Sequence, residues 1–325
     1  MKIAKKIVLA FLVLFVLSSI GGYIYFDQKF TPEENYLTIE NESGVVPLKW
    51  YGSEKNVVLL PIHFEGNDIT YYLQFDTGSP YTVFYSKAIK NISSIATNSN
   101  VAKTAFTLGN TKIGSDHFKI FEMGNDVTND SIKIVGTIGA DVLENRKTLI
   151  NFKESFISLN LSKAPAEFQD NLIDFEFKKR KIIVSGILKD KHEDFLLDSG
   201  TSAFELLTNK EVWQDLKLVN GKTTIEKSQS WERVLTTYTA NCKQTIKFSS
   251  AVIPLKNVTY VEGYSQAQYA MMKFSGMTGM LGNKIFLKNS LYFDCTQGKM
   301  GIQQNLLPNL GFVACAARTI KPVLN

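Results

Sequence analysis

The sequence predicts a mostly β protein of two similar lobes, preceded by an apolar N-terminal segment. Three observations lead to this prediction. Runs rich in β-branched and aromatic residues, separated by polar turns, fill most of the chain, and few stretches have helical periodicity, with residues 209–218 the best candidate. The order of these runs in the first half of the chain is repeated in the second half. A long uncharged stretch distinguishes the first 26 residues from the rest.

Residues 1–26 are predicted to be a transmembrane anchor or a signal peptide. Lys2, Lys5 and Lys6 form a basic leader, and residues 7–26 follow without a single charge. A helix rising 1.5 Å per residue over that length crosses a hydrocarbon core of about 30 Å. Cleavage near residues 19–21 is the alternative. Both interpretations place residues 27 onward outside the cytoplasm, either membrane-anchored in the cell envelope or secretory pathway, or secreted after cleavage.

The composition is that of an ordinary globular protein. The hydrophobic fraction is 44% and the charged fraction 21%, which excludes a disordered chain and a protein with many membrane spans. The net charge is +5, and it falls to +2 for residues 27–325 once the three leader lysines are set aside. That charge is too small for a nucleic-acid-binding surface, so we expect no nucleic-acid partner.

Histidine and cysteine spacing predicts neither a metal site nor a cofactor. The three histidines lie far apart without the HExxH spacing, and no two cysteines form a C-x-x-C pair. The residues concerned are His63, His117, His192, Cys242, Cys295 and Cys315. Cys295 and Cys315 are the candidate pair for a bridge, and the sequence leaves the disulfide state open.

Two hairpin patterns each lead into an aspartate. Residues 57–64 and 69–75 flank a turn, and residues 182–188 and 195–197 flank a second one. The first hairpin ends in Asp76-Thr77-Gly78-Ser79, and the second ends in Asp198-Ser199-Gly200-Thr201.

A second repeat lies downstream of each aspartate. Residues 135–159 match residues 278–302 in having an apolar-glycine pair, then a strand, a polar turn and another strand. The pairs are Ile138-Gly139 and Leu281-Gly282. A pattern that occurs twice indicates two lobes rather than a solenoid. We place the N-terminal lobe at residues 45–164, the C-terminal lobe at 165–325, their joint at 162–171, and a stem or pro-segment at 27–44.

These paired motifs resemble those of the two-lobed, pepsin-like aspartic proteases. The resemblance covers most of residues 45–302, in the same order in both halves. Only 63 residues separate Asp76 from Gly139, against 84 between Asp198 and Gly282, so the compact first lobe is more similar to the retropepsin-type proteases. The resemblance implies a pepsin-like fold in which each lobe is a retropepsin-like, closed β-sheet unit.

The chemistry of such a protein needs two facing carboxylates. One ionised carboxylate deprotonates a water molecule while a protonated partner polarises the substrate carbonyl, without a covalent intermediate. Asp76 and Asp198 are therefore the predicted catalytic residues of an aspartic endopeptidase. Its polypeptide substrate would lie extended in the cleft between the lobes. A peptide-binding or assembly protein that keeps the fold without turnover is the alternative.

The resemblance also implies roles for the neighbouring residues. Hydroxyls at Thr77 and Ser199 would hydrogen-bond across the lobe interface, and Gly78 and Gly200 would allow a sharp turn. The two apolar-glycine pairs would pack behind the aspartate loops.

Ser79 and Thr201 would lie beside the outer carboxylate oxygens. Donation to the ionised carboxylates would lower their pKa values and favour activity below about pH 6. Hydrogen bonds from these hydroxyls to nearby backbone groups are the alternative.

Two departures from the pepsin-type pattern leave roles open. No Tyr or Trp occurs from residue 86 to 134, so a flap between Asn98 and Phe106 would lack its usual aromatic, and we expect Phe106 in the core. The basic run at residues 178–181 is expected to be a solvated strand edge. Cleavage preference, natural substrate, source organism and oligomeric state do not follow from the sequence.

Overall fold

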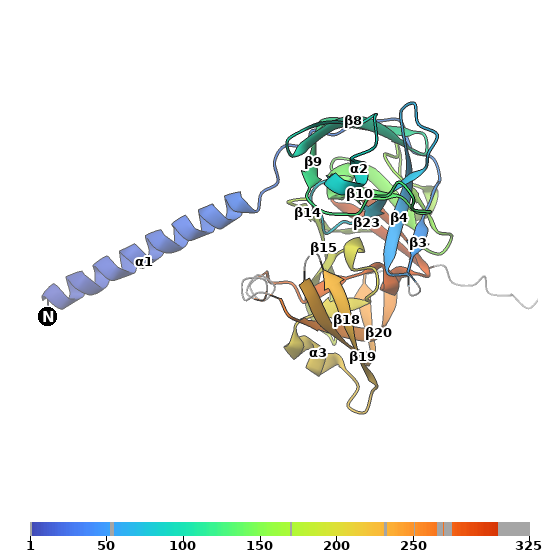
Figure 1. Cartoon of the computed structure of the whole chain (residues 1–325). Coiled ribbons are helices and arrows are strands. Elements are labelled where there is room, and N and C mark those ends of the chain that lie inside the picture. Colours follow the sequence, from blue (N-terminus) through green and yellow to red (C-terminus); the bar gives the residue numbers. More distant parts are fainter. Residues whose placement is uncertain are drawn as a thin grey trace, which may run out of the picture.

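The computed structural model describes residues 2–52, 55–169, 171–230, 233–249, 251–264, 269 and 275–304. Strands predominate, arranged as two barrel-like sheets and a third sheet, and one long helix stands at the N-terminus (Figure 1). The predicted mostly β class is confirmed.

The first barrel is a closed sheet. Its path β9-β6-β10-β5-β4-β8 returns to β9, because β8 pairs with both β4 and β9. β1 and β3 are added at β9 and β4, and β7 pairs with β8. The bounds are β1 Thr38–Glu40, β3 Lys49–Tyr51, β4 Val57–Phe64, β5 Tyr71–Phe75, β6 Val83–Tyr85, α2 Ser86–Ile89, β7 Ala96–Asn98, β8 Val101–Leu108, β9 Thr111–Phe121 and β10 Ile134–Ile138.

The second barrel repeats the closed path of six strands found in the first. Its path β20-β17-β21-β16-β15-β19 closes where β19 pairs with β15 and with β20. The parallel pairs are equivalent too: β5 with β10 in one barrel corresponds to β16 with β21 in the other. The bounds are β14 Glu176–Lys178, β15 Lys181–Leu188, β16 Lys191–Leu197, β17 Leu206–Thr208, α3 Lys210–Leu216, β18 Thr223–Ser230, β19 Arg233–Phe248, β20 Ala251–Glu262 and β21 Gly279–Leu281.

A six-stranded sheet joins the two halves, in the order β13-β23-β22-β11-β12-β2. The central strands β11 and β22 are antiparallel, with Leu149 opposite Tyr292, and each half contributes three strands in the same sequence outward. The two halves are therefore related by an approximate twofold axis. The bounds are β2 Val46–Pro47, η1 Ala140–Leu143, β11 Lys147–Asn151, β12 Phe156–Ser158, η2 Ala166–Phe168, β13 Leu172–Asp174, η3 Ser199–Thr201, η4 Asn283–Phe286, β22 Asn289–Asp294 and β23 Lys299–Gln304.

Local chemistry explains where the predicted hairpins and helix begin. β4 has the predicted bounds, but β5 starts two residues late because the Ile69 amide donates to Asn67 Oδ1 (2.9 Å) instead of joining the ladder. β16 starts early because Lys189 and Asp190 form a two-residue turn with positive φ. Asn209 caps α3 by accepting from the Val212 amide at 2.9 Å.

Aromatic side chains fill the interior of the first barrel. Phe84 makes edge or tilted ring contacts with Phe64, Phe106 and Phe118, with centroids 5.1–6.2 Å apart. Phe106 is 1% exposed, so its expected place in the core is confirmed. Residues 98–106 form the β7–β8 turn and the first part of β8, and a flap role for them stays a prediction.

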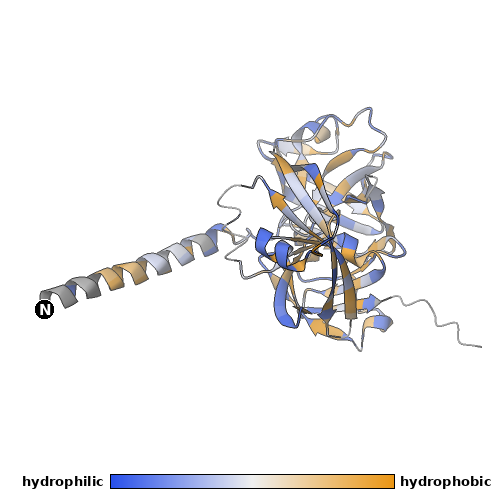
Figure 2. Ribbon diagram, turned by 90° about the horizontal axis from the view of Figure 1, so that it is seen from below, coloured by the Kyte–Doolittle hydropathy of each residue, from blue (hydrophilic) through white to orange (hydrophobic). Residues whose placement is uncertain are grey.

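The N-terminal apolar run forms one continuous helix, α1, from Lys2 to Lys29. Figures 1 and 2 show it projecting from the body of the molecule, with hydrophobic residues on its middle turns. Residues 11–29 are long and apolar enough to cross a membrane and are not buried against the rest of the chain; a signal sequence has the same properties.

We predict that the full chain sediments with membranes and requires detergent for extraction. The physical reason is the transfer of some twenty apolar residues into the bilayer. Ultracentrifugation of lysates, followed by high-salt and detergent extraction, measures this. A freely soluble mature protein lacking residues 1–26 would show instead that the segment is a cleaved signal.

Candidate active site

Asp76 and Asp198 occupy equivalent places at the ends of β5 and β16. The Asp76 amide donates to the Ile138 carbonyl (3.0 Å), and the Asp198 amide donates to the Leu281 carbonyl (2.9 Å). The partner carbonyls end β10 and β21, the parallel neighbours of the aspartate strands. The predicted apolar-glycine pairs thus hold the backbone of each aspartate loop.

Four hydrogen bonds cross between the two aspartate loops. Thr77 Oγ1 accepts from the Ser199 amide (3.0 Å) and donates to the Leu197 carbonyl (2.9 Å). Ser199 Oγ accepts from the Thr77 amide (2.9 Å) and donates to the Phe75 carbonyl (3.0 Å). Both side chains are buried. The cross-interface role expected for Thr77 and Ser199 is confirmed.

Gly78 and Gly200 are required by space rather than by an unusual turn. A Cβ at Gly78 would lie 2.6 Å from Asp198 Oδ1, and a Cβ at Gly200 would lie 2.4 Å from Asp76 Oδ1. The expected sharp turns are present, closed by hydrogen bonds from the Ser79 amide to the Asp76 carbonyl (3.2 Å) and from the Thr201 amide to the Asp198 carbonyl (3.1 Å). Neither glycine has a positive φ, so the close approach of the opposite carboxyl group, and not the backbone conformation, requires glycine. Each carboxyl group therefore lies against the glycine of the opposite loop, which brings the two acids face to face.

Gly139 and Gly282 pack directly behind these loops. A Cβ at Gly139 would come within 2.4 Å of the Tyr81 carbonyl, and one at Gly282 within 2.1 Å of the Thr201 carbonyl. The Ala140 amide also donates to the Ser79 carbonyl at 2.8 Å. The supporting position expected for the two glycines is confirmed.

The carboxylates accept from backbone amides, and the predicted hydroxyl donors point elsewhere. Asp76 Oδ1 accepts from the amides of Gly78 (2.9 Å) and Ser79 (3.2 Å), and Asp198 Oδ1 accepts from the Gly200 amide (2.8 Å). Ser79 Oγ donates to the Tyr81 carbonyl (2.8 Å), and Thr201 Oγ1 donates to the Asp198 carbonyl (2.9 Å). The expected contact of these hydroxyls with the carboxylates is wrong, because each finds a main-chain acceptor in its own turn.

Burial raises the pKa of both aspartates. Desolvation raises the pKa of Asp76, opposed by the hydrogen bond from the Gly78 amide. Desolvation, followed by the negative charge of Asp76, raises the pKa of Asp198 to about 7. The pair therefore retains one proton up to neutral pH. The expected lowering of the pKa values is wrong, and the argument for activity confined to below about pH 6 falls with it.

Two tyrosines that the sequence did not single out lie within the field of the pair. Burial raises the pKa of Tyr85, its 2.6 Å hydrogen bond with Thr137 Oγ1 opposes that rise, and the charge of Asp76 adds to it. Burial and then the charge of Asp198 raise the pKa of Tyr264. Tyr85 ends β6, one residue before the stretch that lacks Tyr and Trp, so each lobe supplies a tyrosine near its aspartate.

Polar side chains just after the apolar-glycine pairs hydrogen-bond to the segments that follow Asp76 and Asp198. Asp141 is 4% exposed and accepts from the amide (2.6 Å) and hydroxyl (2.7 Å) of Thr82. Burial raises the pKa of Asp141 to about 6. In the second lobe, Asn283 Nδ2 donates to Ser202 Oγ at 2.6 Å. The sequence signal for these residues is their position: Asp141 comes two residues after Gly139, and Asn283 comes directly after Gly282.

The histidines and cysteines considered as metal ligands or disulfide partners form no such site among the described residues. In the part of the chain that the structure describes, no group of three His, Cys, Asp or Glu side chains is placed to hold a metal ion. Cys242 and Cys295 are free thiols, and Cys315 lies outside the described residues. No protein-family model matches this chain, and no match was found among curated proteins.

We predict that Gly78→Ala lowers the free energy of unfolding by about 1–3 kcal/mol, because the new methyl group displaces the Asp198 carboxyl group. Chemical denaturation measures the change. Gly114→Ala is the control, since its Cβ would meet no atom closer than the Thr38 hydroxyl oxygen at 3.1 Å. Equal stabilities for the two variants would contradict the close approach of the loops.

We also predict that Asp198→Asn is more stable than the parent protein above pH 7. The pKa of Asp198 is about 7 in the folded protein, against an ordinary value of 3.8 for an aspartate, so the unfolded chain loses this proton first. The parent therefore loses stability as pH rises from about 4 to 7, and the neutral amide does not. Thermal melts at pH 4 and pH 8 test this: the difference in Tm should be present at pH 8 and shrink at pH 4. Asp68→Asn, at an exposed carboxyl group, is the control.

Proposed function

We propose that this chain is an aspartic endopeptidase of the two-lobed, pepsin-like type, tethered outside the cytoplasm by residues 7–26. One observation carries the proposal: Asp76 and Asp198 end equivalent strands of two repeated barrels, and each carboxyl group lies against the glycine of the opposite loop. The six-stranded sheet with its twofold arrangement supports the same fold assignment.

The electrostatics assign different roles to the two acids. Burial and the neighbouring charge of Asp76 raise the pKa of Asp198 to about 7, which favours Asp198 as the holder of the shared proton. Asp76 Oδ1 accepts from the amides of Gly78 and Ser79, and these two hydrogen bonds favour the ionised form of Asp76. Asp76 is then the base that deprotonates a water molecule, and Asp198 is the acid that polarises the scissile carbonyl.

The proton balance closes over one cycle. As the water oxygen bonds to the carbonyl carbon, its proton passes to Asp76 and the Asp198 proton passes to the carbonyl oxygen. The resulting tetrahedral diol then collapses: the carbon–nitrogen bond breaks, Asp76 delivers its proton to the departing amine, and a diol hydroxyl returns a proton to Asp198. Both aspartates regain their starting states, and no covalent intermediate with the enzyme forms.

The substrate is a polypeptide that lies extended between the lobes. Extended chains bind through main-chain hydrogen bonds, with side-chain pockets setting the preference. Each lobe also supplies one tyrosine on whose pKa the nearer aspartate acts, Tyr85 with Asp76 and Tyr264 with Asp198, and these two side chains are candidates to border the scissile bond.

We predict that Asp76→Asn and Asp198→Asn each reduce turnover by more than about 1,000-fold without unfolding the protein. Cleavage of a peptide library by the full chain in detergent, analysed by mass spectrometry, measures turnover, and circular dichroism checks the fold. The upper limb of the parent pH profile should fall near pH 7, where Asp198 loses its proton.

Substantial turnover by folded Asp198→Asn would contradict a shared pair. Tight binding of a peptide inhibitor that mimics the tetrahedral diol, lost in either variant, would support the enzyme. Peptide binding without turnover in the parent would favour the non-catalytic alternative.

A further inference from the structure

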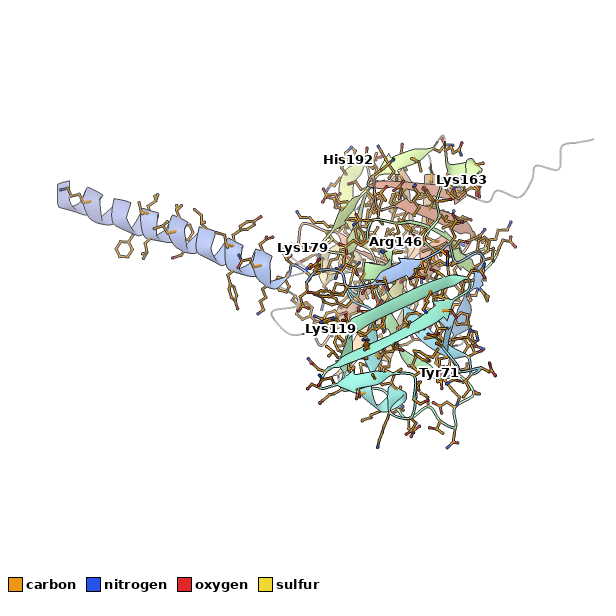
Figure 3. The ribbon with its side chains drawn as sticks, turned by 90° about the horizontal axis from the view of Figure 1, so that it is seen from above. Tyr71, Lys119, Arg146, Lys163, Lys179 and His192 are labelled. Atoms are coloured by element: carbon orange, nitrogen blue, oxygen red, sulfur yellow. The ribbon has the colours of Figure 1, made fainter. Side chains whose placement is uncertain are left out.

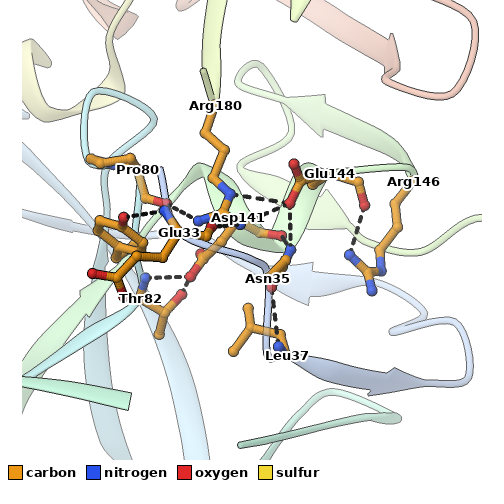
Figure 4. A network of polar contacts seen from close by, with 10 residues as sticks. Glu33, Asn35, Leu37, Pro80, Thr82, Asp141, Glu144, Arg146 and Arg180 are labelled. Atoms are coloured by element: carbon orange, nitrogen blue, oxygen red, sulfur yellow. Dashed lines mark hydrogen bonds and ion pairs between the residues drawn. The ribbon is translucent and has the colours of Figure 1, made fainter. Parts of the chain in front are cut away.

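Residues 27–37, here named the strap, comprise the last residues of α1 and the segment that leads to β1, and they are hydrogen-bonded to the barrel surface. The Glu33 amide donates to the Tyr81 hydroxyl (2.7 Å), and Asn35 Nδ2 donates to the Asp141 carbonyl and to Glu144 Oε2, both at 2.8 Å (Figure 4). Lys119 forms an ion pair with Glu33 at 3.0 Å. Part of the expected stem or pro-segment is therefore held against the surface of the first lobe by hydrogen bonds and an ion pair.

Arg180 holds the strap to the turn between β14 and β15. It is 3% exposed, pairs with Glu144 at 3.0 Å, and donates to the Glu33 carbonyl at 2.9 Å (Figure 4). The expectation of a solvated basic run is wrong for Arg180, because a buried guanidinium needs such partners. Its neighbour Lys179 pairs with Asp27 at 2.6 Å, at the end of α1 (Figure 3).

A cavity of about 360 Å³ lies between the strap, this turn and the first aspartate loop. Gly78 lines it, and Gly78 is the residue whose Cβ would touch Asp198, so the cavity adjoins the pair of acids. The other lining residues are Lys29, Phe30, Thr31, Pro32, Pro80, Tyr81, Lys178, Lys179, Lys181 and Ile183.

The cavity is cationic and contains no carboxylate among its lining residues. Of its four lysines, Lys179 is paired with Asp27, whereas within the described residues we find no ion pair for Lys178 or Lys181. These two are exposed and lie directly opposite each other in the β14–β15 register. Like charges facing across a strand pair are unfavourable, and an anion between them would remove that cost.

We infer that this cavity is a subsite for an acidic side chain of the substrate. The inference rests on the proposed function and specifies its substrate class: polypeptides with Asp or Glu a few residues from the scissile bond, on the Gly78 side of the aspartates. The ammonium groups of Lys178 and Lys181 bind the carboxylate, and Phe30, Tyr81 and Ile183 contact its alkyl part. Contact with Gly78 favours a peptide over an anionic lipid headgroup, because a chain bound at the aspartates must continue past that residue.

The test compares peptides that differ only by Glu or Gln at successive positions on either side of a scissile bond. The full chain in detergent should cleave the best Glu peptide about tenfold faster, in kcat/KM, than its Gln counterpart. Lys178→Gln with Lys181→Gln should abolish this ratio by slowing cleavage of the Glu peptide about tenfold, to the level of its Gln counterpart. Lys178→Glu with Lys181→Glu should reverse the preference towards a Lys peptide. Lys163→Gln with Lys191→Gln, remote from the cavity, is the matched control.

Equal cleavage of Glu and Gln peptides by the parent protein, or the same loss in the control variant, would overturn the inference. Affinity of the two peptides for Asp76→Asn, measured by fluorescence anisotropy, keeps this result separate from the proposed function, because it reports the acidic preference without turnover. Binding to phosphatidylglycerol vesicles, with phosphatidylcholine vesicles for comparison, tests the lipid alternative. Lysine variants that weaken vesicle binding while keeping the Glu preference would also overturn the subsite.

Discussion

The exchange of hydrogen bonds between Thr77 and Ser199 is the constraint on which the candidate site depends. Each hydroxyl accepts from the other loop's amide and donates to a carbonyl of the other lobe, so both hydroxyls are used fully. Because all the residues that take part are buried (Phe75, Thr77, Leu197 and Ser199), breaking any of the four hydrogen bonds would leave an unsatisfied polar atom away from water. This requirement keeps the two loops, and hence Asp76 and Asp198, in one relative position.

The close packing of the two aspartate loops determines the environment of both carboxyl groups. The glycines allow each carboxyl group to rest on the opposite loop, and the packing that excludes water from Asp198 also raises its pKa. The negative charge of one buried aspartate disfavours a second negative charge beside it, so the two acids do not ionise independently. The backbone amides of Gly78 and Ser79 stabilise the charge on Asp76, which is consistent with Asp76 as the ionised member.

The same loop links the site to the N-terminal helix. Tyr81, five residues after Asp76, receives the strap through its hydroxyl, while Thr82 binds Asp141 behind the loop. Arg180 then ties the strap to the second lobe's first hairpin. Polar contacts thus join the strap to the first hairpin of the second lobe and to the segment that follows Asp76, and residues of all three line the cationic cavity.

The sequence alone predicted features that follow from local pattern and from repetition. Alternating apolar runs and turn residues located β4 and both hairpins, Asn209 marked the start of α3, and the duplicated Asp-Thr/Ser-Gly motif identified Asp76 and Asp198 as a pair. Such signals depend on a residue and its near neighbours, or on the comparison of one half of the chain with the other.

Only the tertiary structure decided the partners of Ser79 and Thr201, the raised pKa of Asp198 and the burial of Arg180. A hydroxyl three residues after an aspartate can reach either a carboxylate or a main-chain carbonyl, and the choice depends on loop geometry that sequence spacing does not define. The pKa depends on desolvation by both lobes, and Arg180 is buried by residues more than thirty positions away in the chain, Glu33 and Glu144. Long-range packing of this kind leaves no periodic trace in the sequence.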